Sequence, residues 1–464
     1  MPVTAQSMRH FLLIVLGQTV SVFGSQLTSF VLGVWIYQRS GSATQFSLII
    51  FFALVPQLLV LPTVGVLIDR WDRRRAMIFG DIGSGACTLI IFALVSTNSL
   101  EVVYLYPLVA LSSFFSAFQG PALAASTVLM VPSKHLVRAN GVVEIGQGLA
   151  FMLAPMVAAF LLDTISLKGV ILVDVATFLF AVGTLLVVHV PRPQPRASED
   201  PEPTEKPSIL REATFGWHYI RQRPGLLALL ILFAGVNFTQ GMVQVLLTPL
   251  VLSFATAVEL GQVLSTAIFG TVVGGVVLTV FGGPKRCMPA IFLAIGIQGA
   301  ILFLGGLEPS VLLVTVAATG FMVCQPVILA CSRTLWQTRV APDIQGRVFA
   351  IRRLVSMSAM PFAFLLAGPL ADHVFEPAMA PGGALASALG PWIGTGPGRG
   401  IGLLFIVLGL SVLVILVLAV AYRPLRRLED EIPEISVQPT PPVPDTRAPD
   451  REVTDREVTA PETA

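Results

Sequence analysis

The chain has 464 residues, of which 54% are hydrophobic and only 12% are charged, and its mean hydropathy is +0.81. A water-soluble globule of this size cannot bury so much apolar side chain, so the composition excludes a soluble fold and predicts a lipid-facing surface. The net charge of +2 gives no reason to expect a nucleic-acid partner. The four cysteines lie in or beside apolar segments without CxxC spacing, so we expect neither disulfides nor a metal or cofactor site.

Twelve stretches are long and apolar enough to cross a bilayer core of about 30 Å, which takes roughly 20 helical residues. Helices are the economical solution, because open strands would leave backbone groups unpaired in lipid. The predicted fold is therefore an all-α polytopic membrane protein with twelve transmembrane helices. The predicted segments are 11–36, 45–68, 76–97, 102–130, 139–163, 169–190, 225–253, 259–281, 287–307, 309–332, 348–374 and 401–422.

A proline-rich connector divides the twelve segments six and six. Residues 191–207 hold six prolines and mixed charge, which is typical of an extended linker. Behind it, Leu210, Ala213, Trp217 and Ile220 recur at helical spacing opposite arginines, which predicts an amphipathic helix at the membrane surface. We therefore expect an N-terminal six-helix half (1–190), a cytoplasmic linker with that helix (191–223), a C-terminal six-helix half (224–422) and a disordered tail (423–464).

Basic residues are distributed unevenly over the predicted loops. The loops on one side hold only Arg39, Lys168 and Arg399 of the chain's 29 lysines and arginines. Because cytoplasmic loops carry the excess of basic residues, both termini and the linker are predicted to be cytoplasmic. We expect a multi-pass protein of the cell (inner or plasma) membrane that acts as a monomer.

The loop after the second segment, GVLIDRWDRRRAM from Gly65 to Met77, concentrates charge that the flanking residues avoid. Six of the seven residues from Asp69 to Arg75 are charged. The positive-inside rule and contact with anionic lipid explain the arginines, but they do not explain Asp69. An acid beside arginines and near a neighbouring helix N-terminus predicts a charged latch that breaks when the two halves rock.

The second half carries a degenerate copy of this loop. Aligning Gly65 with Gly275 places GVVLTVFGGPKR after the eighth segment, with Thr279 opposite Asp69. Parallel repeats of this kind occur in transporters whose site lies between the halves near mid-membrane.

The loop resembles the cytoplasmic signature of the major facilitator superfamily, Gly-x-Leu-x-Asp-Arg-x-Gly-Arg-Arg, with Asp72 in place of the second glycine. The resemblance extends from the first segment to the twelfth and implies the major facilitator fold. Stretches such as VPSKHLVRAN and QGRVFAIRR are most similar to the branch of bacterial drug:proton antiporters that contains macrolide-efflux and enterobactin-exporter proteins. In this family the motif gates alternating access, and the resemblance assigns that role to Gly65, Asp69, Arg70, Arg73 and Arg74.

The fifth segment carries a pattern similar to the family's antiporter motif, which is Gly, eight residues, Gly, three residues, Gly-Pro, two residues and Gly-Gly. Every matching position is small and the proline is present, but alanines replace most of the glycines. Small residues permit close helix approach and a proline permits a kink, so generic helix packing is an open alternative. The matching positions are Gly141, Ala150, Ala154, Pro155, Ala158 and Ala159.

Acidic residues inside membrane segments are functional candidates, because burying a charge in lipid is costly. Glu144, Asp174 and Asp81 are the candidates for proton coupling, although each can equally be an acid hydrogen-bonded to neighbouring helices. For Asp81 the nearby arginine cluster is expected to hold the carboxylate ionised. We place Glu144 first, because Gly146 and Gly148 are expected to leave space around it, and Asp174 second.

The family architecture implies that segments 1, 4, 7 and 10 line a central cavity. The polar and aromatic residues at mid-membrane are uncharged, which suits a large, amphipathic, weakly charged ligand better than a phosphate. Each glutamine can equally hold two helices together. The substrate-binding candidates are Gln26, Phe118, Gln119, Asn237, Gln240 and Gln325.

Together these features favour a secondary active transporter that exports amphipathic small molecules, of a drug, macrolide or siderophore kind, by alternating access and proton antiport. The alternatives are an importer or a lysolipid flippase on the same fold, or a non-transporting membrane scaffold, against which the intact gating loop argues. The partners expected are therefore the substrate, protons and the lipid bilayer. An enzyme is not expected, and no G-x-x-x-x-G-K-[ST] loop is present to bind ATP.

Overall fold

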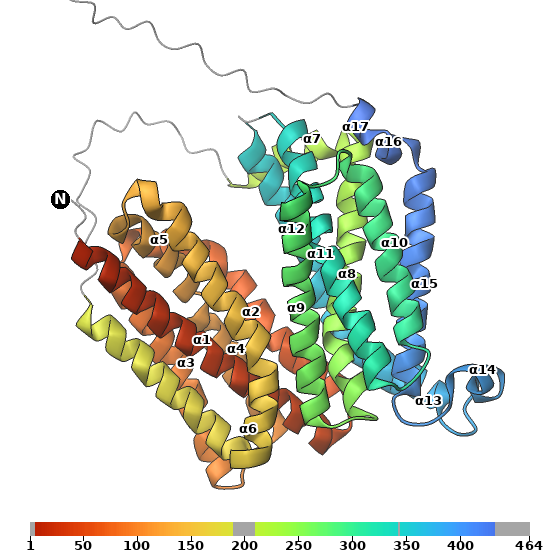
Figure 1. Ribbon diagram of the computed structural model, residues 1–464, viewed down its shortest axis with the longest axis horizontal. Coiled ribbons are helices and arrows are strands. Elements are labelled where there is room, and N and C mark those ends of the chain that lie inside the picture. The colour runs from red at the N-terminus through yellow and green to blue at the C-terminus, as the bar shows by residue number, and fades with distance from the viewer. Residues whose placement is uncertain (1–4, 189–208, 342–343, 432–464) are drawn as a thin grey trace, which may run out of the picture.

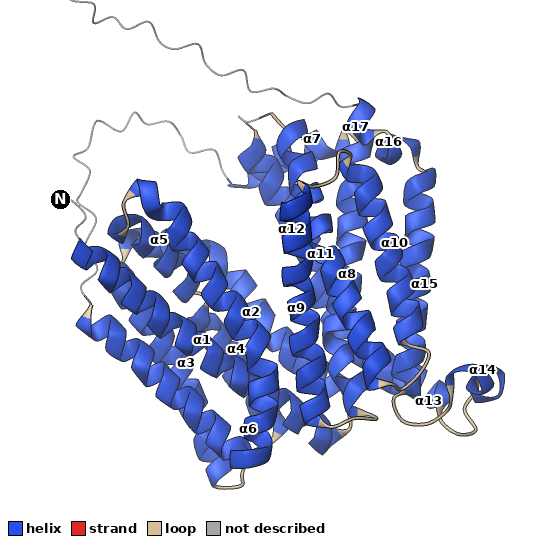
Figure 2. Ribbon diagram, viewed as in Figure 1, coloured by secondary structure: helices blue, strands red, loops and turns tan. Residues whose placement is uncertain are grey.

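The computed structural model describes residues 5–188, 209–341 and 344–431, and every regular element in these ranges is a helix (Figures 1 and 2). The predicted proline-rich connector (191–207) and most of the predicted tail (423–464), from residue 432 onwards, lie outside the described residues.

Eleven of the described helices are long and apolar enough to cross a membrane. One of them, α6 (Leu136–Val187), has 52 residues and reverses at Ser166, where φ is 63° and ψ is 174°. A straight helix of that length would extend about 78 Å, more than twice the bilayer core. In Figure 1 two arms of α6 run back from this turn, so α6 supplies two crossings and the described chain makes twelve. The predicted all-α membrane fold is confirmed.

The N-half, defined here as α1–α6, forms one bundle (Figure 1). Its fourth crossing consists of two helices, α4 and α5, which meet at Ala117 and Phe118. Asp72 begins α3, because its carboxylate accepts the backbone N–H groups of Arg74 and Arg75 at 3.0 and 3.4 Å. The helices before α6 are α1 (Ala5–Ser40), α2 (Ala43–Arg70), α3 (Arg73–Ser96), α4 (Val102–Ser116), α5 (Gln119–Met130) and the 3-10 turn η1 (Ser133–His135).

The C-half, defined here as α7–α17, forms the second bundle (Figure 1). Its membrane helices are α8 (Pro224–Leu252), α9 (Ala257–Phe281), α10 (Cys287–Gly305), α11 (Val311–Arg339), α12 (Gln345–Leu370) and α15 (Arg399–Ala421). Its short helices are α7 (Ile209–Arg221), the π-helical turn η2 (Ala371–Phe375), α13 (Glu376–Met379), α14 (Ala386–Ile393), α16 (Arg423–Arg426) and α17 (Leu428–Glu431).

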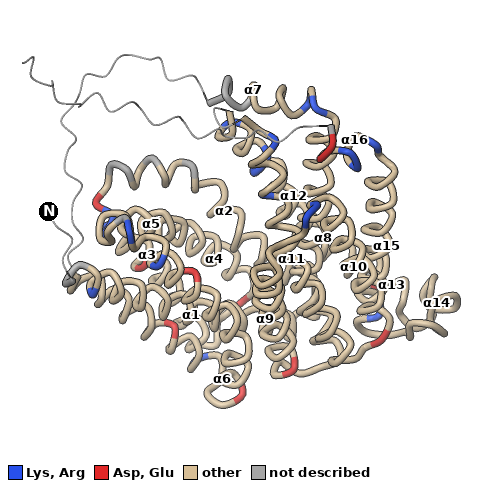
Figure 3. The backbone as a smooth tube through the Cα atoms, turned by 45° about the horizontal axis from the view of Figure 1, so that its top comes forward, with Lys and Arg blue, Asp and Glu red and all other residues tan. Residues whose placement is uncertain are grey.

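The molecule has two distinct faces. At the terminal face, defined here by the start of α1 and the end of α15, lie α7, α16 and α17, at the top of Figure 1. The opposite face carries the α1–α2 turn, the reversal of α6, and α13 and α14. Lysines and arginines gather towards the terminal face in Figure 3, whereas Lys168 and Arg399 lie near the opposite one.

The two halves touch mainly through two pairs of helices, α2 with α12 and α6 with α9, and less extensively where α1 and α2 meet α8 and α2 meets η2. A Cβ atom built on Gly368 of α12 would lie 2.3 Å from Cα of Thr44, so the backbones of α12 and α2 nearly touch. A Cβ atom on Gly261 of α9 would lie 2.6 Å from the carbonyl oxygen of Pro155. Gly368, Thr44 and Gly261 each lie near the end of their helix at the opposite face, so the halves are joined at that face.

Helix α7 occupies the predicted position of the amphipathic helix and packs on α12. Ile220 is fully buried, and Gly216 lies against the carbonyl oxygen of Arg347. Trp217, expected on the apolar stripe with Ile220, is instead 43% exposed. Gly216 and Ile220, four residues apart, form the buried face of α7, and Trp217 lies about 100° from Gly216 around the helix, at the edge of that face.

Candidate functional site

A cavity of about 500 Å³ lies between the two halves, and we call it the inter-half cavity. Its walls come from α1, α2, α4 and α6 on one side and from α8, α9, α10, α11 and α15 on the other. Most of its lining is aliphatic or aromatic, and polar groups come from a few uncharged side chains, among them Gln26, Gln240, Gln244 and Thr248. Such a lining suits a ligand with a large apolar surface and a few hydrogen-bonding groups.

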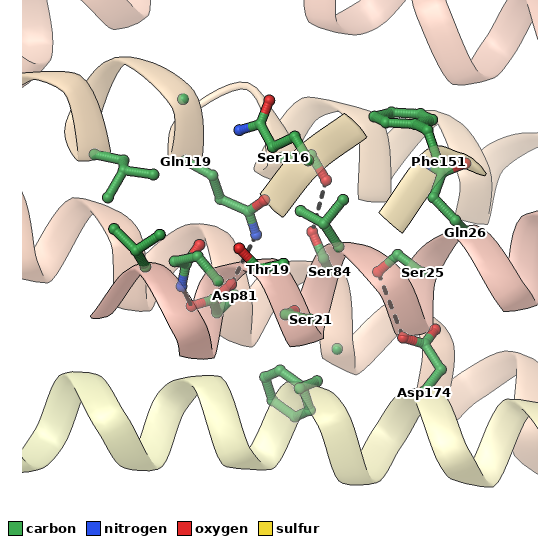
Figure 4. A pocket seen from close by; sticks show the side chains of 18 of the residues that line it. Thr19, Ser21, Ser25, Gln26, Asp81, Ser84, Ser116, Gln119, Phe151 and Asp174 are labelled. Atoms are coloured by element: carbon green, nitrogen blue, oxygen red, sulfur yellow. Dashed lines mark hydrogen bonds between the residues drawn. The ribbon is translucent and has the colours of Figure 1, made fainter. Parts of the chain in front are cut away.

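A second cavity, of about 320 Å³, lies inside the N-half, and we call it the polar cavity (Figure 4). Amides, hydroxyls and two carboxyls, those of Asp81 and Asp174, line it together with apolar side chains. No lysine, arginine or histidine lines it within the described part of the chain. Gln26 and Phe151 line both cavities, so the two spaces adjoin at these side chains.

Asp81 is held by two amides from neighbouring helices. Its side chain is only 1% exposed, and its two carboxylate oxygens accept Nε2–H bonds from Gln18 of α1 at 2.8 Å and Gln119 of α5 at 2.7 Å. The expectation that the arginine cluster occupies Asp81 is therefore wrong. Asp81 lies two turns into α3, where the side chains that reach it are neutral amides.

Asp174 projects from the second arm of α6 towards α1. It is 3% exposed, and its Oδ1 lies 3.4 Å from the hydroxyl of Ser25, which donates to it (Figure 4). A Cβ atom on Gly24 would lie 2.8 Å from the same oxygen, so the glycine is what lets α1 approach the carboxyl. The side chain of Thr177, one turn along α6, also faces Gly24.

Glu144, placed first among the acids from the sequence, is exposed and lines neither cavity. Of the two glycines expected to leave space around it, Gly148 does, but Gly146 does not, because a Cβ atom there would lie 2.6 Å from the hydroxyl of Thr19 on α1. Positions two apart point about 200° away from one another around a helix, so a helix that turns Gly146 towards α1 turns Glu144 away from it.

The six substrate-binding candidates fall in different places. Gln26 and Gln240 line the inter-half cavity, and Gln240 accepts a 2.8 Å bond from Nε2 of Gln325. Gln119 lines the polar cavity instead. Asn237 donates to the backbone oxygen of Phe233, one turn earlier on its own helix.

Phe118 is buried inside the N-half and lines neither cavity. Its ring lies 5.3 Å from that of Phe79 and 5.8 Å from that of Phe114, both in edge contacts, and it stacks at 6.3 Å on Trp71. These contacts tie α3, α4 and the start of α5 together beneath the gating loop. Phe118 is therefore placed for packing within the N-half.

The gating loop joins α2 to α3 at the terminal face. Arg74 donates to the carbonyl oxygens of Leu185 and Leu186 at 2.5 and 2.6 Å, where α6 ends. A Cβ atom built on Gly65, which lies within α2, would have no neighbouring atom within 4 Å. The side chains of Asp69 and Arg70 lie outside what the structure describes, so the latch expected at Asp69 stays a prediction.

Two of the antiporter-like positions, Pro155 and Ala159, lie at the contact between α6 and α9. Ala159 Cβ would lie 2.8 Å from a Cβ on Gly261. Ala154 and Ala158 are fully buried and pack instead with Leu27 and Val31 of α1 within the N-half. Pro155 lines the inter-half cavity, and the next residue, Met156, donates its backbone N–H to the hydroxyl of Ser265 on α9 at 3.2 Å. The small residues Ala159 and Gly261 thus allow one half to pack on the other.

Sequence reasoning missed several residues of these cavities. Gln18, Ser25 and Phe151 line the polar cavity, and Gln244 lines the inter-half cavity. A polar side chain within an otherwise apolar segment could have identified such residues, as Gln18 does in the first predicted segment. Within the described residues, no three His, Cys, Asp or Glu side chains gather to hold a metal ion.

The chain matches a known protein family and resembles several characterised relatives. Residues 14–364 match the pattern described as Major Facilitator Superfamily. The chain is 27% identical to macrolide efflux protein A of Streptococcus pyogenes over 364 residues, covering 77% of this chain and 88% of that protein. It is 25% identical to the multidrug efflux pump Tap of Mycobacterium tuberculosis over 353 residues, covering 73% and 81%. The enterobactin exporter EntS of Citrobacter koseri is 24% identical over 347 residues, covering 73% and 79%.

Among solved structures, a bacterial homologue of the human lysosomal transporter Spinster, captured inward-facing and unoccupied, superposes with a TM-score of 0.65. The alignment covers 90% of this chain and 96% of that one at 16% identity, so it supports the fold alone.

Proposed function

The chain belongs to the Major Facilitator Superfamily, and on that premise we propose that it exports amphipathic small molecules in exchange for protons. The single observation that carries the proposal is the pair of adjoining cavities, one apolar and between the halves, the other polar and holding two buried carboxyls. Relatives named for efflux of macrolides, several drugs and enterobactin support export as the direction.

The inter-half cavity is the proposed substrate site. Its aliphatic and aromatic walls match a ligand with a large apolar body, and Gln26, Gln240 and Gln244 offer hydrogen bonds without charge. In the proposed cycle the cavity opens alternately at the cytoplasmic and outer faces. We assign the terminal face to the cytoplasm from the excess of lysine and arginine there.

Asp174 is the proposed proton carrier. Hydroxyls surround it, among them that of Ser25, and a hydroxyl can donate to an ionised carboxylate or accept from a protonated one. Asp81 instead accepts one amide N–H bond on each oxygen, and such bonds favour the ionised form over the protonated one. We therefore propose that Asp81 stays ionised and fixes α1, α3 and α5, while Asp174 exchanges the proton.

The proposed link between the two sites is their shared wall. Gln26 sits one residue after Ser25 on α1, and Phe151 faces it from α6 (Figure 4). A change in the protonation of Asp174 would move Ser25, and a ligand in the inter-half cavity would press on Gln26 of the same helical turn. Proton and substrate thereby act on one turn of α1.

The test compares Asp174→Asn with Glu144→Gln in inverted membrane vesicles to which macrolides, siderophores and lysolipids are added from outside. We expect Asp174→Asn to lose accumulation driven by an imposed pH gradient while retaining substrate exchange, and Glu144→Gln to behave as wild type. If Glu144→Gln alone loses the pH response, the carrier is Glu144. If a protonophore leaves wild-type export unchanged, proton coupling fails altogether, and if substrate moves only out of the vesicles, export is the wrong direction.

A further inference from the structure

We propose that Asp372 is an inter-half latch: its carboxylate, supplied by the C-half, caps the N-terminus of α2 in the N-half and holds the opposite face closed. The proposal deepens the proposed function, since a latch has meaning only if the two halves move. It concerns a residue outside both cavities and at the other end of the membrane from the gating loop.

Three hydrogen bonds join Asp372 to the first residues of α2. Its Oδ2 accepts from the hydroxyl of Ser42 at 2.6 Å and from the backbone N–H of Thr44 at 2.9 Å, and its Oδ1 accepts from the N–H of Ala43 at 3.0 Å. The first N–H groups of a helix have no partner within the helix, and the helix dipole favours a negative charge at this end. The contact is therefore a charge-assisted cap that spans two bundles.

The backbone around Asp372 is shaped for this contact. Asp372 lies in the π-helical turn η2, where α12 ends, and Gly368 one turn earlier lets the backbone of α12 approach Thr44. A Cβ atom on Gly368 would also lie 2.5 Å from the hydroxyl of Ser47. Any side chain at position 368 would push α12 away from α2 and stretch all three bonds.

The surroundings of the contact suit a bond that opens and closes. Asp372, Ser42 and Thr44 are all partly exposed at the end of their helices. When the halves separate, water can take over the hydrogen bonds of the carboxylate and of the helix end, so neither is left buried without a partner. The same bond deep within the membrane would be too costly to break in every cycle.

Glu376, one turn further along, provides a matched control. Its carboxylate accepts the backbone N–H groups of Gly398 at 3.2 Å and Ile401 at 3.0 Å, at the start of α15. The chemistry is that of Asp372, a carboxylate capping a helix N-terminus, but both partners belong to the C-half. Removing Glu376 weakens the C-half without releasing one half from the other.

The test reads access to the inter-half cavity from each side of the membrane. The four native cysteines are first replaced, and a single cysteine is then introduced at Gln244, which is exposed in that cavity. A membrane-impermeant maleimide is applied to right-side-out and to inverted vesicles. We expect Asp372→Ala to accelerate labelling from the opposite face at least tenfold, and Glu376→Ala to leave the ratio of the two sides unchanged. The measurement uses neither substrate nor proton gradient, so it stands apart from the test of coupling.

Two results would overturn the latch. One is unchanged labelling in Asp372→Ala protein that elutes as a folded species. The other is the same acceleration in Glu376→Ala, which would indicate general loosening. If Asp372→Ala does not fold, cysteines at Ser42 and Asp372 joined by a short bifunctional methanethiosulfonate, which links them through reducible disulfides, decide the matter. We expect the cross-link to abolish labelling from the opposite face and reduction to restore it, whereas labelling that continues in the cross-linked protein refutes the proposal.

Discussion

Gly261 offers a second way to disturb the contact between the halves, through packing rather than charge. The change to alanine places a methyl group 2.6 Å from the carbonyl oxygen of Pro155, 2.8 Å from Cβ of Ala159 and 3.2 Å from Cα of Met156. Two of these three atoms are backbone, so α6 and α9 must move apart. The strain exists only while the opposite face is closed, provided that α6 and α9 separate when it opens.

The size of the effect follows from that geometry. Adding one methylene-sized group to a tightly packed contact costs about 1–3 kcal/mol. A substitution that raises the free energy of one of two states shifts the equilibrium towards the other state. Each difference of about 1.4 kcal/mol changes the equilibrium constant tenfold. Gly261→Ala should therefore raise the ratio of molecules open at the opposite face roughly 5- to 150-fold.

Two other glycines separate this effect from simple destabilisation. A Cβ atom on Gly409 of α15 would lie 2.5 Å from the backbone nitrogen of Phe303 on α10, a clash of the same kind within the C-half. Gly409→Ala should lower the melting temperature without changing which side reaches the cavity. Gly275 faces open space, so Gly275→Ala should change neither.

The assay is the two-sided labelling of the Gln244 cysteine, combined with the melting temperature of purified protein. We expect faster labelling from the opposite face in Gly261→Ala and none of that acceleration in Gly409→Ala. If Gly261→Ala lowers the melting temperature and leaves the sidedness of labelling unchanged, α6 and α9 stay in contact throughout the cycle. The reasoning that makes this contact part of the moving interface would then be refuted.

Three further predictions concern helix ends and topology. Asp72→Ala should lower the free energy of unfolding, measured by denaturant titration, by about 1 kcal/mol. Asp72→Gly should lower it by only a few tenths of a kcal/mol, because glycine is tolerated where a helix begins, and equal losses would contradict the cap. Glu429→Ala should cost a similar amount, since its carboxylate caps α10 at Cys287 and Met288, and an unchanged unfolding curve would exclude this. Of cysteines at Ser198 and Thr395, only the one at Thr395 should react from outside intact cells, and the reverse pattern would overturn the topology.

Hydrophobicity and length were enough to predict the membrane helices. The predicted segments 139–163 and 169–190 even separate the two arms of α6, because LLDTISLKG interrupts the apolar run around Ser166. These features are local, since each helix must satisfy its own backbone in lipid.

The direction in which each acid points was not predictable in the same way. Glu144 and Asp174 look alike as sequence, each a lone acid in an apolar segment. Which of them faces a cavity depends on how α6 is rotated against α1, and Gly146 and Gly24 settle that by packing close to α1. Such rotation is a property of the assembled bundle.

Asp372 illustrates the same limit over a longer distance. It falls within the predicted eleventh segment, 330 residues after Ser42, and nothing near it in the sequence indicates a partner in the other half. Only the assembled fold brings the end of α12 to the start of α2. The part that Asp372 plays in joining the halves is therefore not visible at the level of sequence.

The two copies of the gating loop are stabilised differently, and this bears on why only one keeps its acidic residues. In the N-half, Asp72 within the loop caps the helix that follows it. At the aligned position of the C-half stands Gly282, which ends α9 in the left-handed conformation with φ of 73°. The cap of the next helix, α10, comes instead from Glu429, 142 residues further along the chain.

This difference has a consequence for which acidic residue each loop can lose. Glu429 belongs to α17, whose Leu428 is fully buried in the C-half, so the second loop is anchored to the chain's last described helices. The first loop is capped by its own Asp72, and Arg74 ties the start of α3 to the carbonyl oxygens at the end of α6. The first loop therefore cannot lose Asp72 without losing the cap of α3, whereas the second loop can lose the aligned acid because Glu429 caps α10.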